Sequence, residues 1–595
     1  MAFDGALNTM ASTLTSPAFS PSGFALKQRL HALLSQPSAV TMMLAVSIWF
    51  SLLCNSSFWS ALWPQIAGDA ADKLAVVLLA GAAVTGLQWA LLSLFAWRGL
   101  LKPVATAVVV IAAVAASMMQ QYGVVIDTGM LVNVWQTDAM EVKGLISFKL
   151  VLQVLALSVL PMVWIWRAQV RYLRWSKQAL HNVLTVAMAT VLAVLCLLPL
   201  YKEAAAIMRN DKSLRYRITP SNAVYGAIAS LRPAKAAGPL VPQGLDAHVA
   251  LATPAATTKP RLLVLVVGET ARADHFSTNG YARNTTPELL AADVINFPHV
   301  TSCGTSTAVS LPCMFSVLGK DGHTASKQHN ENVLDVVQRA GYRVLWLDNQ
   351  AGCKGVCDRV VSETTSAALT PALCADQECL DEAMLSGLDA RVARLLSSGA
   401  SQPGKSPGVV VVMHQMGSHG PEYYRRSPAA MKGFTPECRT ANFGDCTQEA
   451  IINAYDNSIR YTSHFLGLTM QWLQAQSAQY DTAMLYLSDH GESLGEAGLY
   501  LHGMPYALAP SAQTHVPMVA WLSPAWLARQ PLNTHCLREQ AQLPRSHDNL
   551  SPTLLGLLSI QTKVYKQDLD VFSSCVSQAQ AQTHTQPPAT SKDLA

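Results

Sequence analysis

Charge is scarce in this sequence, and neither sign prevails. Of 595 residues only 13% are charged, about half the usual share for soluble proteins. The formal net charge is +4, which gives no reason to expect a nucleic-acid partner. No internal repeat is present either, so nothing indicates a solenoid. What remains is an apolar chain with a mean hydropathy of +0.22, long enough for at least two units.

Five apolar runs are long enough to cross a bilayer, which takes roughly 20 largely apolar residues. Their interiors lack charge, and they cover residues 38–57, 74–96, 103–122, 149–166 and 182–200. A cleaved signal peptide would account for the first run but not for the other four. Buried helices of a large soluble protein are the alternative. The charge-free runs favour five membrane-spanning helices.

Lysine and arginine gather in the loops on one side of these predicted spans. They precede the first span and occupy the loops between spans two and three and between spans four and five: Lys27, Arg29, Arg98, Lys102, Arg167, Arg171, Arg174 and Lys177. Short loops rich in these residues stay in the cytoplasm. The fifth span therefore carries everything from about Tyr201 onward to the other side, which in a Gram-negative cell is the periplasm.

The cysteines test this orientation independently. Cys54 and Cys196 lie in predicted spans, and the other ten follow the last span. An even number in close pairs is typical of disulfides in an oxidising compartment. Zinc ribbons are the competing interpretation of two of the pairs, but the predicted compartment favours disulfides. The expected pairs are Cys303–Cys313, Cys353–Cys357, Cys374–Cys379, Cys438–Cys446 and Cys536–Cys575.

These features divide the chain into five parts. They are a cytoplasmic tail over 1–37, a transmembrane domain over 38–201, a connector over 202–258, a second domain over 259–575 and a disordered tail over 576–595. Between spans three and four, the run DTGMLVNVWQTDAMEV has helical spacing. It is expected to lie at the outer membrane surface.

The second domain alternates short apolar runs with amphipathic helices. The apolar runs predict buried strands: RLLVLVVGE, YRVLWLD, GVVVVMHQ, TAMLYLSDH and VPMVAWL. Helices are expected at ENVLDVVQRAG, which Gly341 closes, and at QEAIINAYDNSIRYTSHFLGLTMQWLQAQ. This alternation favours an α/β sandwich with a largely parallel central sheet. Polar ligands gather beyond the carboxyl ends of such strands.

Polar residues follow two of these strands directly. Glu269 follows the first strand in VVGETAR, and Asp489 and His490 follow another in SDHGESLGE. A carboxylate beside an oxygen-plus-imidazole pair suits a metal site. The alternatives are a helix-capping carboxylate and a structural polar pair.

Hydroxyl groups and histidines complete the candidate site. The run TSCGTSTAVSLPC places small hydroxyl residues in a loop bounded by Cys303 and Cys313, where a nucleophile could be fixed and activated by a metal. A Ser/Thr-rich turn without function is the alternative. His414, His419 and His502 follow predicted strands. Lone histidines are usually structural, but together these groups suit transfer through a covalent phospho-enzyme.

The runs VVGETARADHFSTNGY, TSCGTSTAVSLPCMFS, HQMGSHGP, INAYDNS and LSDHGESLGEAGLYLHGMP closely resemble the lipid A phosphoethanolamine transferases. That group includes the mobile colistin-resistance enzymes and belongs to the alkaline phosphatase/sulfatase superfamily. The resemblance covers roughly 38–575. It implies an N-terminal domain of five transmembrane helices and a C-terminal periplasmic α/β sandwich, in a multi-pass, monomeric inner-membrane protein.

The resemblance also implies roles for the catalytic residues. Thr307 corresponds to the nucleophile that becomes modified with phosphoethanolamine. Glu269, Asp489 and His490, with the Thr307 oxygen, correspond to ligands of one tightly bound zinc ion, and a second transient ion stays open. His419 and His502 correspond to histidines near the phosphate that are suited to proton transfer; which is acid and which is base stays open.

Other matching positions imply substrate contacts. Asn133 and Glu141 match residues suited to the donor headgroup, and Lys354 matches a lysine whose ammonium could hold a phosphate oxygen. His414 is placed in the same substrate-binding set. Two positions depart from the family: Gln350 stands where relatives often have Asn, and Gly322 replaces an acidic residue found in some relatives.

The implied reaction moves phosphoethanolamine from phosphatidylethanolamine to a lipid A phosphate, and the implied consequence is polymyxin resistance. Alternatives are another acceptor (lipopolysaccharide core, Kdo or a periplasmic glycan), glycerol-phosphate transfer, and a non-catalytic sensor of lipid or zinc. A sulfatase is disfavoured because no C-x-P-x-R or S-x-P-x-R site is present.

Overall fold

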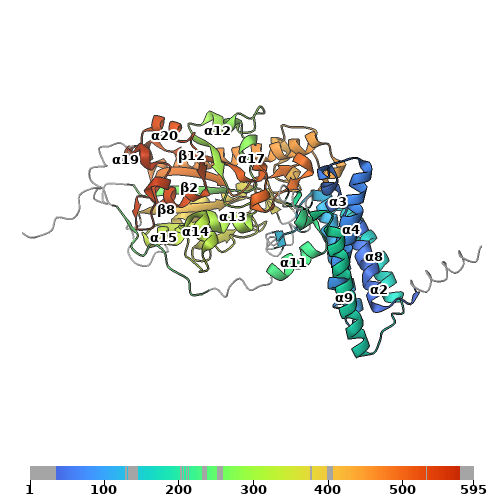
Figure 1. Ribbon diagram of the computed structural model, residues 1–595. Coiled ribbons are helices and arrows are strands. Elements are labelled where there is room, and N and C mark those ends of the chain that lie inside the picture. Colours follow the sequence, from blue (N-terminus) through green and yellow to red (C-terminus); the bar gives the residue numbers. More distant parts are fainter. Residues whose placement is uncertain are drawn as a thin grey trace, which may run out of the picture. The chain divides into compact units, whose positions relative to one another are not determined.

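The computed structural model contains membrane-type helices and a large α/β domain (Figure 1). The structure describes residues 35–576 except 128–129, 132–133, 135–141, 143–144, 202–203, 205–206, 209–210, 212, 231–237, 251–258, 376–377, 398–406 and 531. Two compact units interleave along the chain, the first formed by Met1–Leu53, Ala67–Val110 and Ala156–Ala204 and the second by the remaining segments. The limits 38–201, 202–258 and 259–575 therefore stay predictions.

Within the described residues, four helices are long and apolar enough to cross a membrane. They are α4 (Ala70–Ser93), α5 (Leu101–Tyr122), α8 (Phe148–Arg167) and α9 (Trp175–Leu197). The first predicted span is instead a bent pair, Ala39–Cys54 and Ser56–Gln65, with 56° between its halves. The described residues therefore hold four to five membrane-spanning helices, depending on whether that pair crosses as one span.

Small residues bring α4 and α9 together within the first unit. A Cβ added at Gly86 would lie 3.0 Å from the Ala189 carbonyl oxygen and 3.3 Å from the Ala193 methyl group. Such stripes of small residues let membrane helices pack backbone to backbone. A capping box begins α4: the Asp69 carboxylate accepts from the Ala71 and Asp72 amides, and the Asp72 carboxylate accepts from the Asp69 amide.

The second unit contains an eight-stranded mixed sheet in the order β13-β3-β12-β9-β2-β8-β4-β5. The five predicted strands are present as β2 (Arg261–Gly268), β4 (Arg343–Asp348), β8 (Gly408–His414), β9 (Asp481–Ser488) and β12 (His515–Leu522). β4, β8, β2 and β9 run parallel to one another, whereas β12 is antiparallel to β9. β3 (Ile295–Thr301), β5 (Val361–Thr364) and β13 (Arg545–Ser546) were not predicted.

Both faces of the sheet are covered, as the continuous apolar runs require. Along β2, Leu262, Val264 and Val266 belong to one core cluster, while Leu263, Leu265 and Val267 belong to the other. The first cluster includes the predicted long helix, α17 (Gln448–Ala475). The second includes α13 (Thr307–Met314), α15 (Val333–Arg339) and α21 (Leu550–Leu557). In Figure 1, α17 and α13–α15 lie on opposite sides of the sheet. This is a three-layered α/β sandwich.

Five disulfides link this unit internally. They join Cys303 to Cys313, Cys353 to Cys357, Cys374 to Cys379, Cys438 to Cys446 and Cys536 to Cys575. These are the pairs expected from the spacing, and they exclude the zinc-ribbon alternative because a disulfide sulfur is no thiolate ligand. Among the described cysteines, Cys54 and Cys196 remain as thiols.

Candidate active site

Parallel strands bring the candidate ligands together at one edge of the sheet. Gly268 at the end of β2 is paired with Ser488 at the end of β9, so the residues that follow each strand meet. The Asp489 amide donates to the Gly268 carbonyl at 2.9 Å. Glu269, Asp489 and His490 are all fully buried, and their ligand atoms lie within 4.8 Å of one another.

Thr307 reaches this group from the first turn of α13. Its hydroxyl lies 3.0 and 3.2 Å from the two Glu269 carboxylate oxygens and 3.4 Å from His490 Nε2. His490 Nε2 lies 3.4 Å from Glu269 Oε1 and 3.5 Å from Asp489 Oδ2. The four side chains therefore converge on one small buried volume.

The three ionisable side chains in this volume shift one another's pKa. Burial raises the pKa of Asp489, and the neighbouring Glu269 charge raises it further, to about 7. Burial also opposes ionisation of Glu269, but the hydrogen bond and charge of His490 outweigh it and hold the pKa of Glu269 below its ordinary value. Burial lowers the pKa of His490, yet Asp489 and Glu269 outweigh that effect and raise it to about 10.

A divalent cation fits this group. Two buried carboxylates face each other, and Asp489 Oδ2 has no hydrogen-bond partner within the described part of the chain. Two carboxylates, an imidazole nitrogen and a hydroxyl match the oxygen and nitrogen donors that zinc accepts. A divalent cation would offset the repulsion between the two buried carboxylates, which contributes to the raised pKa of Asp489.

Histidines surround the same point. His414, at the end of β8, is fully buried, with Nδ1 3.3 Å from Asp348 Oδ2 and Nε2 3.9 Å from Glu269 Oε2. Burial lowers the pKa of His414, but the Asp348 carboxylate outweighs it and raises it above its ordinary value. The His502 ring centroid lies 4.5 Å from that of His490 and 5.4 Å from that of His419. The structure thus brings all three predicted histidines to the site.

Two carboxylates at the site were missed by the sequence reasoning. Glu492 is fully buried, accepts from the Tyr423 hydroxyl at 2.6 Å and lies 2.8 Å from His502 Nδ1. Asp348 accepts from the Trp346 indole at 2.8 Å and contacts His414. Asp348 ends the predicted strand YRVLWLD, and Glu492 lies in SDHGESLGE, just beyond the end of β9. Their position at the carboxyl end of a strand was the feature of the sequence that could have indicated them.

The remaining predicted substrate residues are placed less directly. The backbone amide of Gln350 donates to Asp348 Oδ1 at 3.0 Å. The other oxygen of the same carboxylate contacts His414. The Lys354 ammonium donates to the Ala351 carbonyl in its own turn at 2.9 Å. Asn133 and Glu141 lie outside the described residues.

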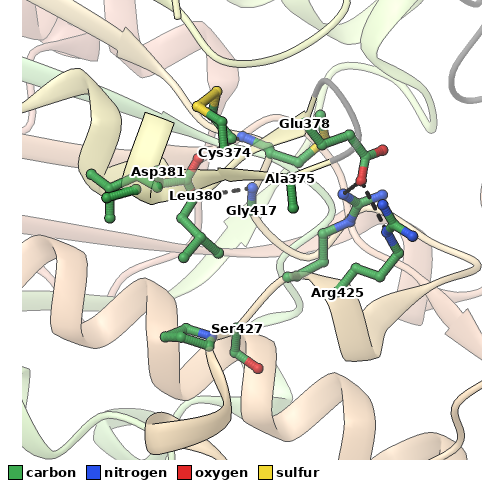
Figure 2. Close-up of a pocket in the computed structure, with 14 residues that line it drawn as sticks. Cys374, Ala375, Glu378, Leu380, Asp381, Gly417, Arg425 and Ser427 are labelled. Atoms are coloured by element: carbon green, nitrogen blue, oxygen red, sulfur yellow. Dashed lines mark hydrogen bonds and ion pairs between the residues drawn. A yellow bond between two sulfur atoms is a disulfide. The ribbon is translucent and has the colours of Figure 1, made fainter. Parts of the chain in front are cut away.

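A pocket of about 370 Å³ adjoins the loop that follows β8 (Figure 2). Asp381 lines it and accepts from the Met416 and Gly417 amides at 2.8 and 3.2 Å. Glu378 on its rim contacts both Arg425 and Arg426, at 3.3 and 3.0 Å. The next amide of the loop, that of Ser418, donates to the Glu269 carbonyl at 3.0 Å. The pocket wall therefore supports the backbone of the site, and no candidate metal ligand lines it.

A sulfatase family model matches residues 261–560, and a model described as phosphoethanolamine transferase EptA/EptB matches residues 84–234. The phosphoethanolamine transferase EptA of Escherichia coli K12 is 36% identical over 558 residues, which cover 92% of this chain and 99% of that protein. This chain belongs to the phosphoethanolamine transferase family. It is therefore an enzyme that transfers phosphoethanolamine.

Two further relatives extend the match. The phosphatidylethanolamine transferase Mcr-1 of Escherichia coli is 37% identical to this transferase over 88% of the chain and 95% of its own length. Among solved structures, the integral membrane lipooligosaccharide phosphoethanolamine transferase A from Neisseria meningitidis superposes with a TM-score of 0.86 at 33% identity. The match covers 91% of this chain and 99% of that one. Both regions of the transferase therefore have counterparts in one membrane protein.

Proposed function

We propose that this transferase moves phosphoethanolamine from phosphatidylethanolamine to a phosphate of lipid A through a covalent intermediate on Thr307. The observation that carries the proposal is the Thr307 hydroxyl, which lies at a helix start between the Glu269 carboxylate and His490 Nε2. A nucleophile needs both a fixed position and a means of losing its proton. The N-terminal turn of α13 and the surrounding ligand set supply these.

Glu269, Asp489, His490 and the Thr307 oxygen would hold one Zn²⁺ ion, which when bound favours the alkoxide and offsets charge on the phosphoryl oxygens. The Thr307 oxygen attacks the phosphorus of the donor, and the bond from phosphorus to the diacylglycerol oxygen breaks. The departing oxygen takes a proton from His419 or His502. Glu492 binds Nδ1 of His502, which leaves Nε2 to exchange that proton.

In the second half-reaction a lipid A phosphate oxygen attacks the same phosphorus, and the Thr307 oxygen leaves. Lys354, Gln350 and His414 are proposed to hold phosphate oxygens, while Asn133 and Glu141 are proposed to bind the ethanolamine headgroup. The enzyme would work as a monomer in the inner membrane with its α/β domain in the periplasm. Adding a cationic group to lipid A would weaken binding of polymyxins and other polycationic peptides.

The proposal is tested by mass spectrometry of lipid A from a susceptible Gram-negative host. Cells expressing the wild-type protein should gain lipid A heavier by one phosphoethanolamine group, and cells expressing Thr307→Ala should not. Unchanged lipid A, with folded wild-type protein in the membrane, would refute the acceptor. A new mass on core sugars or periplasmic glycans in the same cells would name the acceptor instead.

Zinc affinity should rise with pH, because ligands bind the metal only after losing their protons. Before metal binds, burial and the Glu269 charge raise the pKa of Asp489 to about 7, while the two carboxylates overcome burial and raise that of His490 to about 10. Binding therefore displaces protons from the ligands, so Zn²⁺ affinity should rise as the pH rises, most steeply below about pH 7, where Asp489 is also protonated. Chelator competition at several pH values measures this slope, and a flat profile would contradict the ligand set.

A further inference from the structure

The backbone directly after Glu269 is strained. Thr270 has φ +52°, in the left-handed region, which is a genuine outlier for a β-branched residue. Its hydroxyl has no hydrogen-bond partner among the residues that the structure describes. Such a conformation persists only where its surroundings hold it in place.

Hydrogen bonds from two other elements hold this segment. The Thr270 amide donates to Asp489 Oδ1 at 3.3 Å, and the Ala271 amide donates to the Ser488 hydroxyl at 2.9 Å. Two further hydrogen bonds come from one side chain on α17. The Tyr455 hydroxyl donates to the Thr270 carbonyl at 2.7 Å and accepts from the Arg272 amide at 2.9 Å. A single phenol thus bridges both ends of the strained turn.

Tyr455 is itself rigidly placed. It is fully buried, and its ring makes edge-to-face contacts with His275 and Tyr423 at centroid distances of 5.1 and 5.4 Å. Burial raises the pKa of the Tyr455 phenol well above its ordinary value, so the hydroxyl remains a donor. The motif INAYDNS, which the reaction itself does not use, thereby acquires a role.

We propose that Tyr455 is a positioning residue for Glu269. Its hydroxyl keeps Thr270 in the left-handed conformation, and that conformation sets the direction in which the Glu269 carboxylate faces Thr307, Asp489 and His490. The inference rests on the proposed function in one respect, that Glu269 binds the metal. It adds a residue that touches neither metal nor substrate and acts only through the backbone.

The test compares two hydroxyl deletions on the same helix, in the full-length protein purified in detergent. Tyr455→Phe should lower Zn²⁺ affinity, measured by chelator competition, about 10- to 100-fold, the usual range for a residue that orients a ligand. At saturating Zn²⁺ kcat should fall about 10-fold or more with the donor KM unchanged, because misplacement affects the reacting geometry. Tyr461→Phe is the control. Its buried hydroxyl donates to Glu382 at 2.9 Å, so it loses a comparable hydrogen bond while keeping wild-type Zn²⁺ affinity.

A second background distinguishes positioning from general destabilisation. Glycine adopts positive φ without strain, so in a Thr270→Gly protein the same Tyr455→Phe change should cost no more than a few-fold in Zn²⁺ affinity. Equal affinity of Tyr455→Phe and Tyr461→Phe, or an undiminished loss in the glycine background, would overturn the positioning role alone. A wild-type protein that binds no Zn²⁺ would overturn the proposed metal site and this inference together.

Discussion

In a Thr307→Ala variant, release of diacylglycerol from phosphatidylethanolamine should fall by roughly 10⁴- to 10⁶-fold, as when other hydrolase nucleophiles are removed. The reason is geometric: among the described residues, this hydroxyl lies within hydrogen-bond distance of both Glu269 and His490. The phosphoethanolamine adduct should disappear as well. Intact-mass measurement of the protein after brief exposure to donor, without acceptor, detects that adduct directly.

Thr307→Ser is the matched control for that result. Serine keeps the hydroxyl and loses only the methyl group that restricts its rotamer. Its activity should stay within about 100-fold of wild type, the usual cost of a modest misplacement, and it should still form the adduct. An adduct on the alanine variant would place the nucleophile at another residue, and Ser306→Ala and Ser310→Ala would be the next variants to measure.

Asp489→Asn should reduce Zn²⁺ affinity by more than about 100-fold, beyond the range for residues that only orient a ligand. The same change should not lower the stability of the metal-free protein. Asparagine retains an oxygen to accept from the Thr270 and His490 amides, and it removes one of two buried carboxylates that repel each other. Thermal unfolding with and without Zn²⁺ separates the effects, since ligand at 100 times its Kd adds about 2.7 kcal/mol to wild type only.

Asp481→Asn provides the comparison on the same strand. Asp481 begins β9, at the opposite end from Asp489, and pairs with Arg529 at 3.1 Å. Its replacement should lower stability slightly and leave Zn²⁺ affinity unchanged. Equal zinc-induced stabilisation of wild type and Asp489→Asn would remove Asp489 from the ligand set.

The strands, and the polar residues that directly follow them, were predictable because their patterns are local. The run from Arg261 to Gly268 is buried along its whole length, and a continuous apolar run of that length bounded by polar residues indicates such a strand. Its parallel pairing with β9 then brings Glu269 to Asp489. β3 was missed because its alternation breaks at Pro298 and His299, neither of which is buried, and because a proline inside a run weakens the strand pattern.

Partners that meet only through the fold were not predictable. Glu492 binds His502 from ten residues away. The run SDHGESLGE also contains Asp489, His490 and Glu496, and the sequence alone does not show which of these side chains contacts His502. Tyr455 reaches Thr270 across 185 residues, and nothing local to either residue indicates the contact. The number of spans also stays open, because a 56° bend between two apolar helices leaves no mark in hydropathy.

Long separation along the chain has a consequence for biosynthesis. Thr270 and Asp489, whose atoms are in contact, lie 219 residues apart, and Thr307 lies 183 residues before His490. A ribosome-bound chain that ends short of His490 contains Glu269 and Thr307 but no closed ligand cage. The proposed metal site would therefore be complete only after the chain has been synthesised through His490. A chain that ends before Asp489 would lack two of the four proposed ligands, so metal binding would report that the domain had been made past β9.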